Sequence, residues 1–456
     1  METEASRAGR SGLGGRKCVG KNTIGALVAA LIALGIYLVS PVKHSPDSRW
    51  VLPTAQSLIT DHDLGLQEWG PTIRRLGTYG LRRNKKEFLN YFPIGPALVA
   101  APFLLVVERY PGLAPRLLGV AHNGSPEWIL RHRRIIEHRI AAYVGAAAVG
   151  ACFLAVSGVA STGVAALITA AVAFGSPLWS VGTRGLWQHG PALLCLFAAL
   201  ALLVRCEGWR ADSAVRWVGG AALGAVLGLA YLMRPTGALA ILCLGTFILV
   251  YRRFLLPPVV IGGGLALIPF FTTTWLRYEQ ILPPYYRTTT LAFTTHTFEV
   301  IAANLLSPSR GVWVMSAWTV LALLVVRRRP EPLVVTLSVW SLLHLVLVSL
   351  FDRWWAGHSY GPRFMSEAVA PLALLAALGL TTITSRAQQL GAGFLVALSI
   401  ALHAPGALSS STVRWNLRPR NVDESPERIW SIRDPQWLAP WRKRRSFSAP
   451  LRAAEN

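Results

Sequence analysis

The sequence predicts an all-α polytopic membrane protein with about 11 transmembrane helices and a long first outer loop. Hydrophobic residues make up 53% of the 456 residues, and charged residues only 15%. Apolar blocks of about 16 to 21 residues recur along the chain, each near the length that crosses a bilayer. The basic residues behind the net charge of +23 stand in short clusters between these blocks, where they set membrane topology. We therefore expect no nucleic-acid partner.

The first apolar block, residues 23–40, follows a basic N-terminal segment, residues 1–21. The block is long and lacks a small-residue cleavage site, so it predicts an uncleaved signal anchor with the N-terminus in the cytoplasm. None of the five cysteines lies in a long polar loop, and we expect no disulfide framework.

The first outer loop spans residues 42–136 and contains one short apolar segment. The run at 97–107 has about eleven residues, too few to cross a bilayer at about 1.5 Å per residue. We therefore expect residues 93–108 to form a helix that dips into the outer leaflet and returns.

A membrane domain over residues 22–406 accounts for the predicted spans. If residues 93–108 do not cross, every short basic connection between spans lies in the cytoplasm, as the positive-inside rule requires. The polar tail, residues 407–456, is rich in Trp and Pro and then faces outward. The predicted spans are 23–40, 138–158, 161–181, 189–204, 215–232, 236–251, 256–275, 311–326, 332–351, 363–383 and 391–406.

This topology places the polar motifs on the outer side, beginning with Asp47 just after the first span. A carboxylate where the chain leaves the bilayer is costly unless it has a task or a partner. Asp47 is the predicted catalytic residue. The alternative is an interfacial ion pair with Arg49 beside Trp50.

Three arginines, Arg234, Arg310 and Arg363, stand at outer ends of predicted spans, in turns rich in Gly and Pro. A guanidinium binds phosphate through a planar fork of donors. We predict a shared phosphate site, against the alternative that each arginine reaches the lipid head groups. The further candidate substrate-binding residues are Arg49, Arg184, Trp187, His189, Trp354, Trp355, His358 and Tyr360.

Other classes of site have little support in the sequence. We find no Walker loop, no Gly-x-Ser-x-Gly motif and no His-x-x-x-His pair, and we expect neither a metal nor another cofactor. Charged residues are nearly absent from the predicted spans, whereas ion-coupled transporters usually carry them at the bilayer midplane.

The layout resembles the GT-C glycosyltransferases, which include protein O-mannosyltransferases, aminoarabinose transferases and the catalytic subunit of oligosaccharyltransferase. The resemblance covers roughly residues 20 to 385 in layout, and in detail only Asp47 and the motif from Trp354 to Arg363. It implies that an acidic residue of the first outer loop, here Asp47, is the catalytic base. Asp47 lacks an adjacent second acidic residue, and residues 187–189 read Trp-Gln-His where oligosaccharyltransferases have an acidic motif.

We therefore expect a membrane glycosyltransferase that passes a sugar from a polyprenyl-phosphate donor to a lipid, glycan or protein acceptor. Asp47 is the expected general base, and Trp187, Trp354, Trp355 and Tyr360 are expected to stack on the sugar. The expected location is the bacterial cytoplasmic membrane, with active residues on its outer face. The alternative function is a flippase for lipid-linked saccharides or another polytopic transporter.

Overall fold

The computed structural model describes residues 5–43, 45–84, 87–123, 127–209, 212–287, 291–328 and 330–442, with residues 5–21 described by their backbone alone. The predicted cytoplasmic segment, residues 1–21, and the predicted tail, residues 407–456, therefore lie partly outside the described residues.

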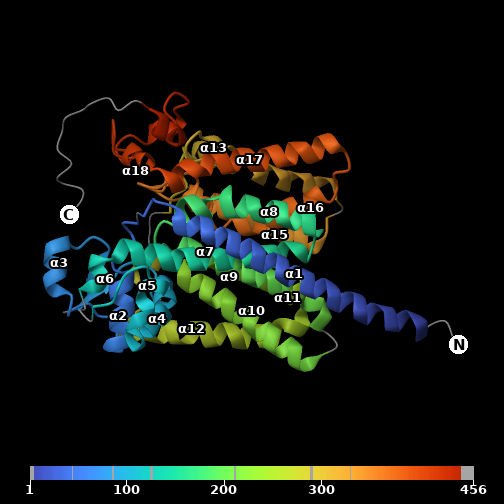
Figure 1. Ribbon diagram of the computed structural model, residues 1–456, viewed down its shortest axis with the longest axis horizontal. Helices are drawn as coiled ribbons and strands as arrows, with labels where there is room; N and C mark the ends of the chain where they lie inside the picture. Colours follow the sequence, from blue (N-terminus) through green and yellow to red (C-terminus); the bar gives the residue numbers. More distant parts are fainter. Residues whose placement is uncertain are drawn as a thin grey trace.

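Seven segments of the described chain are long and apolar enough to cross a membrane, and an eighth qualifies if a bent helix pair counts as one span. They run along the long axis of the molecule (Figure 1). They contain α1 (Ala5–Val39), α7 (Arg133–Ser157), α8 (Thr162–Phe174) with η2 (Leu178–Gly182), α10 (Ser213–Met233), η4 (Arg253–Leu255) with α12 (Leu256–Tyr278), α15 (Pro332–Ser349) and α17 (Arg386–Leu408).

The remaining four predicted spans form shorter helices, so the predicted count of 11 spans is not confirmed. They are α9 (His189–Leu203), α11 (Gly237–Tyr251), α14 (Val312–Met315) followed by η6 (Ala317–Arg327), and α16 (Val369–Leu380). Two of them are short because their outer ends leave the α-helix. Residues 363–368 form the 3₁₀ turn η7 (Arg363–Met365) and its exit, and this turn carries Arg363.

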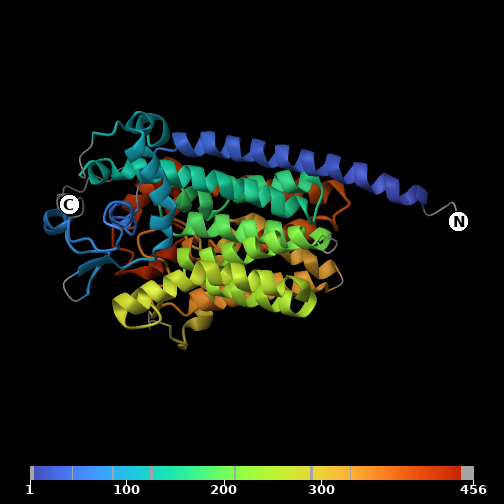
Figure 2. The ribbon, with the colours of Figure 1, turned by 90° about the horizontal axis from the view of Figure 1, so that it is seen from below.

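The first outer loop folds at the bundle end away from the N-terminus (Figures 1 and 2). Helix α4 (Gly95–Arg109) ends before Pro111, and the chain then bends by 117° into residues 111–117, which matches the predicted dipping helix in position. Whether this pair crosses the bilayer stays a prediction. The loop contains α2 (Val51–Thr60), α3 (Gly70–Leu76), the antiparallel strands β1 (Leu81–Asn84) and β2 (Glu87–Asn90), α4 (Gly95–Arg109), η1 (Pro111–Leu113), α5 (Ala114–Leu117) and α6 (Trp128–Arg131).

Helices α10 and α12 touch through their backbones because both carry glycine at the contact. A Cβ added to Gly224 would lie 1.9 Å from the carbonyl oxygen of Val259, and one added to Gly262 would lie 1.9 Å from that of Ala221. Small residues allow this approach between helices in a bilayer. The contact fixes one wall of the cavity described below.

The polar tail covers the same end of the bundle as the first loop (Figure 1). In both views the N-terminus of α1 lies at the opposite end of the bundle (Figure 2). The polar motifs thus share one end of the molecule. The short elements not yet named are η3 (Cys206–Trp209), η5 (Pro284–Arg287), α13 (Thr297–Leu306), α18 (Ser411–Trp415), η8 (Pro426–Trp430) and η9 (Gln436–Trp441).

Candidate active site

Asp47 lies in the turn between α1 and α2 and contacts two side chains. Its Oδ2 is 2.5 Å from Nη2 of Arg363, and its Oδ1 accepts a hydrogen bond of 2.8 Å from the Tyr79 hydroxyl. Arg49 instead donates to the carbonyl oxygen of Leu76 at 2.7 Å. The interfacial Asp47–Arg49 pair that the sequence offered as an alternative is therefore not the pair that forms.

Opposing effects act on the Asp47 carboxyl. Burial raises its pKa and is the largest single effect, but the Arg363 guanidinium, the Tyr79 hydroxyl and His189 together lower it by more, so the resulting pKa lies below the usual value. Burial and the adjacent carboxylate raise the pKa of Tyr79, so its hydroxyl stays protonated and donates. At neutral pH, Asp47 is thus a carboxylate that can accept a proton.

A buried Glu137 supports the turn that carries Asp47. The Ser48 hydroxyl donates to Oε2 of Glu137 and lies 2.6 Å from the Ser45 hydroxyl. The turn packs so closely on Gly185 that a Cβ there would lie 2.5 Å from Cβ of Ser45. The position of Asp47 thus depends on contacts with α7 and with the loop before α9.

Arg363 is the next member of a chain of buried polar side chains. Its Nε donates to Nε2 of His189 at 2.9 Å, and Nδ1 of His189 is 3.0 Å from Oε1 of Glu367. Nη1 of Arg234 forms an ion pair with Oε2 of Glu367. The structure therefore brings together four predicted site residues, Asp47, Arg363, His189 and Arg234.

Glu367 was missed in the sequence analysis although it joins His189 to Arg234. It follows Arg363 by four residues and begins a strongly apolar stretch, which is a costly place for a carboxylate. That same argument singled out Asp47, and it could have singled out Glu367.

The loop at 184–189 supplies an aromatic support for Arg363. The guanidinium carbon lies 4.1 Å from the ring centroid of Trp187, so a cation–π contact occupies one face of this indole. Arg184 is buried in the same loop, where Nη1 donates to the carbonyl oxygen of Ser180 at 3.3 Å. Burial lowers the pKa of Arg184 to about 10.

Arg310 makes its hydrogen bonds with a different set of groups. Its Nε donates to the carbonyl oxygen of Trp355 at 3.0 Å, and Nη2 donates to that of Ser359 at 3.2 Å and to Oδ1 of Asn416 at 3.1 Å. Nη1 donates to the side-chain oxygen of Gln436. Arg310 thus ties the tail to the loop before Arg363, and its predicted role in binding phosphate directly stays a prediction.

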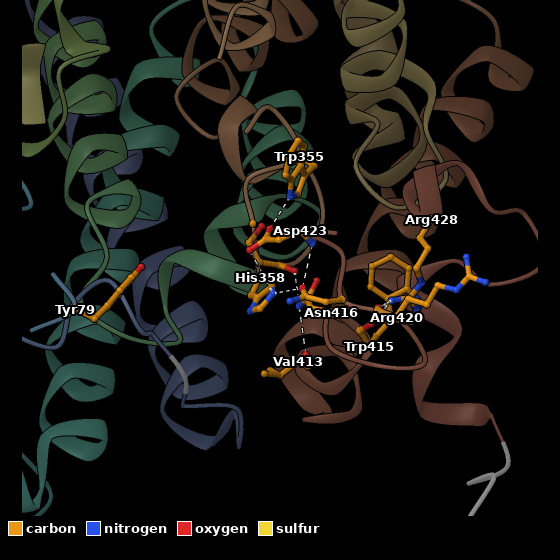
Figure 3. A network of polar contacts seen from close by, with 12 residues as sticks. Tyr79, Trp355, His358, Val413, Trp415, Asn416, Arg420, Asp423 and Arg428 are labelled. Carbon is orange, nitrogen blue, oxygen red and sulfur yellow. Dashed lines mark hydrogen bonds and ion pairs between the residues drawn. The ribbon is translucent and has the colours of Figure 1, made fainter. Parts of the chain in front are cut away.

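The other candidates from the 354–363 motif also contact the tail or α17. Nε1 of Trp355 donates to Asp423 at 2.8 Å (Figure 3). Nε2 of His358 lies 2.7 Å from Oδ1 of Asn421. The Tyr360 hydroxyl donates to the carbonyl oxygen of Leu402 at 2.5 Å. Trp354 packs edge-on against Trp355, with ring centroids 6.0 Å apart.

In the 354–363 motif, the backbone turns at two glycines before Arg363, and both glycines lie in the left-handed region. Gly357 and Gly361 both have φ of +58°, a conformation that glycine adopts without strain. These turns let one loop contact the tail through Trp355 and His358 and then bring Arg363 to Asp47.

Two cavities adjoin each other near Asp47. The larger has a volume of about 400 Å³ and lies between the first outer loop and helices α10 and α12, with mostly apolar side chains such as Leu98, Leu232 and Phe270. The smaller, of about 10 Å³, is lined by Asp47, Trp187 and Gln188 among others. Phe92 and Pro93 line both cavities.

The groups around Asp47 do not match the ligands of a divalent metal. A guanidinium faces one carboxylate oxygen and a protonated phenol faces the other, where a metal ion would need further anionic or neutral donors. Within the described ranges, no three His, Cys, Asp or Glu side chains gather as a metal site would require.

Comparison with known proteins shows a likeness in fold and none in sequence. No protein-family model and no curated protein matches the chain. Among solved structures, ArnT from Cupriavidus metallidurans bound to undecaprenyl phosphate matches with a TM-score of 0.55 and 17% identity, over 86% of this chain and 65% of that chain. The chain thus spans just under two thirds of that protein.

Two further structures agree with this match. The apo state of the same ArnT gives a TM-score of 0.55 at 15% identity, over 86% of this chain and 78% of that chain. Archaeal oligosaccharyltransferase AglB from Archaeoglobus fulgidus, in complex with an inhibitory peptide and a dolichol-phosphate, gives 0.50 at 12% identity, over 94% of this chain and 61% of that chain.

The chain is therefore an integral membrane protein with the GT-C glycosyltransferase fold. The resemblance expected from the sequence is confirmed at the level of the fold. ArnT and AglB are proteins to which it is similar in architecture.

Proposed function

We propose that this protein is a GT-C glycosyltransferase that transfers a sugar from a polyprenyl-phosphate donor to an acceptor on the outer face of a bacterial cytoplasmic membrane. One observation carries the proposal: an ionised carboxylate, Asp47, lies against Arg363 beside a large apolar cavity. A base, a cation for phosphate and a space for a lipid are the parts that such a transfer requires. The GT-C fold supports the same class of reaction.

The larger cavity suits the lipid part of the donor. Its walls are mostly apolar, and α12 on one side exposes Leu265 and Ile268 outside the bundle, where membrane lipid lies. A polyprenyl chain would enter from the bilayer beside α12. Its phosphate would then lie toward Arg363, which is held on Trp187 and has Arg234 behind it through His189 and Glu367.

In the transfer step, Asp47 accepts the proton of the acceptor hydroxyl as that oxygen bonds to the anomeric carbon. The bond between the anomeric carbon and the phosphate oxygen breaks, and polyprenyl phosphate leaves with its electron pair. Direct displacement inverts the anomeric configuration. Arg363 stabilises the charge on the departing phosphate, an effect that is strong in a site with little water.

Arg363 has a second task in this proposal. It pairs with Asp47 in the structure, so a donor phosphate competes with Asp47 for the guanidinium. When Arg363 turns to the phosphate, Asp47 loses its cationic partner and becomes more basic. Donor binding would thus prepare the base. Because Arg363 supplies the positive charge at this point, we propose a step without a divalent metal.

The proposed orientation has the N-terminus in the cytoplasm and the tail outside. Single cysteines at Ser425, in the tail, and at Glu331, in the basic connection between η6 and α15, test it in intact cells. We expect an impermeant thiol reagent to label position 425 and not position 331. The reverse pattern would place the candidate site in the cytoplasm and contradict the proposal.

A transfer assay tests the chemistry. Purified protein would be given labelled polyprenyl-phosphate hexoses and pentoses with membrane lipid, glycan or peptide acceptors, and the anomeric configuration of the product would be determined. We expect transfer with inversion from at least one donor. Movement of lipid-linked saccharide across vesicles without transfer would instead support the transporter alternative.

A further inference from the structure

The smaller cavity beside Asp47 has room for a single polar group. Its volume of about 10 Å³ is close to that needed by one water molecule or one hydroxyl. Asp47, Trp187 and Gln188 line it together. Any group that enters it is therefore next to the proposed base.

Two lining residues have buried polar atoms without a hydrogen-bond partner in the described part of the chain. These atoms are Oε1 of Gln188 and Nε1 of Trp187, in side chains that are 7% and 3% exposed. Buried polar groups are nearly always paired, because leaving one unpaired is unfavourable. Two such atoms on consecutive residues at one cavity point to a missing ligand group.

Both side chains are held in place by their other contacts. Nε2 of Gln188 donates to the Tyr285 hydroxyl at 3.0 Å, and the Tyr285 ring packs on Tyr91 and Phe92 with centroids 5.4 and 5.7 Å away. The Trp187 ring is held against Arg363. The free oxygen and the free N–H are therefore presented by side chains with little freedom to turn away.

The two unpaired atoms, Oε1 of Gln188 and Nε1 of Trp187, indicate which kind of chemical group can bind between them. Gln188 offers an acceptor and Trp187 offers a donor, whereas a phosphate or carboxylate needs donors and an ammonium needs acceptors. A hydroxyl both donates and accepts. We propose that Gln188 and Trp187 form a subsite for one hydroxyl of the saccharide that reacts at Asp47.

This subsite rests on the proposed function and adds a specificity-determining residue to it, Gln188. The hydroxyl belongs either to the sugar of the donor or to the acceptor. In both cases its position in the cavity fixes the orientation of the reacting molecule relative to Asp47.

The test compares substrates that differ by one hydroxyl. Gln188→Met keeps the length of the side chain and removes the hydrogen bonds, and Trp187→Phe keeps a ring under Arg363 and removes the N–H. Gln67→Met, at an exposed position of the first outer loop, is the matched control. The probes are short-chain polyprenyl-phosphate hexoses and their single-deoxy forms.

If the hydroxyl belongs to the donor sugar, the wild type should use one deoxy donor about tenfold less well than its parent, the effect of one lost hydrogen bond. Gln188→Met should use parent and deoxy donor almost equally, both about tenfold below the wild-type rate with the parent. Gln67→Met should behave as wild type. Trp187→Phe provides the same comparison if Gln188→Met fails to fold.

Binding without acceptor identifies the source of the hydroxyl. Weaker binding of the parent donor by Gln188→Met assigns the hydroxyl to the donor sugar. Unchanged donor binding, with transfer about tenfold slower, assigns it to the acceptor. If Gln188→Met and Trp187→Phe both bind and transfer as wild type does, the cavity holds only water and the subsite is refuted. If the wild type neither binds nor transfers any donor, the proposed function fails and the subsite fails with it.

Discussion

Two buried arginines lie at the end of the molecule that carries the first loop and the tail, and one has a charged partner while the other has neutral partners. Arg363 faces the carboxylate of Asp47 and belongs to a chain with His189, Glu367 and Arg234, which we call the carboxylate chain. Arg310 donates to backbone carbonyls and side-chain amides that hold the tail, which we call the tail network.

Because of this difference, a ligand can displace the partner of Arg363 more easily than the partners of Arg310. An anionic ligand can replace Asp47 at Arg363, because one anion substitutes for another. Arg310 shares its charge among several neutral oxygens from three segments of the chain, and a ligand would have to displace them together. In Figure 3, Tyr79, the partner of Asp47, lies apart from the residues of the tail. We infer that the carboxylate chain performs the chemistry and the tail network holds the loop that positions Arg363.

The largest expected effect on stability follows from breaking the carboxylate chain at Glu367. Glu367→Gln leaves the buried Arg234 without its anionic partner, and we expect a loss of about 3–5 kcal/mol in the free energy of unfolding. Unfolding of purified protein in detergent measures it. Glu424→Gln, at an exposed site in the tail, should change stability by no more than about 0.5 kcal/mol. Equal losses in the two variants would contradict the account.

The next effect concerns the pH dependence set by Arg363. Because Arg363 lowers the pKa of Asp47 in the free enzyme, the wild-type kcat/KM for the donor should fall only below the usual carboxyl range, near pH 4. Arg363→Gln leaves burial as the main effect on Asp47, so its pKa rises and the acid limb of the pH–rate profile moves to higher pH. The ion pair likewise stabilises the fold above the unfolded pKa, and this contribution is lost as pH falls through the folded pKa. An unshifted acid limb would show that the titrating base is another group.

Arg310→Lys tests the tail network. Lysine cannot donate to all the acceptors that the guanidinium reaches, and the loss of two or three net hydrogen bonds should cost about 2 kcal/mol of stability. The rate of the chemical step in folded protein should stay within about threefold of wild type. Single-turnover kinetics beside unfolding measurements separate the two effects. A slow chemical step in a fully stable variant would assign Arg310 to phosphate binding after all.

The smallest effect is expected at Tyr79. Its hydroxyl donates to Asp47, but the residue is 55% exposed, so water can replace the lost hydrogen bond in Tyr79→Phe. We expect at most about a threefold fall in transfer, with the acid limb displaced upward by less than in Arg363→Gln. A loss as large as that from removing Arg363 would make Tyr79 a direct participant in the reaction.

Sequence reasoning predicted the helical membrane fold because apolar blocks and basic clusters report directly on the bilayer. It placed each of the 11 segments on a helix, but four of these helices are shorter than the others, and the count of 11 spans is not confirmed. The segments near 311 and 363 adjoin apolar stretches, and they fold into tight turns that close on distant parts of the chain. Hydropathy carries no information on those tertiary contacts.

At the site, the sequence identified Asp47, Arg363, His189 and Arg234, since polar residues at outer span ends are rare and costly. It could not distinguish Arg363 from Arg310, because both follow Gly or Pro turns and their partners are remote in sequence. Trp355 was expected to stack on sugar and His358 to bind substrate, and their contacts with Asp423 and Asn421 depend on where the tail folds.

The most direct test of the division between the carboxylate chain and the tail network compares one aspartate from each. Asp47→Asn removes the proposed base, and Asp423→Asn makes the same change in the tail, beside Trp355 and His358. In single-turnover sugar transfer by folded protein, we expect Asp47→Asn to lose about 10²–10⁴-fold in rate while donor binding survives, and Asp423→Asn to stay near wild type. Near-normal transfer by Asp47→Asn, or an equal loss in both variants, would contradict the account.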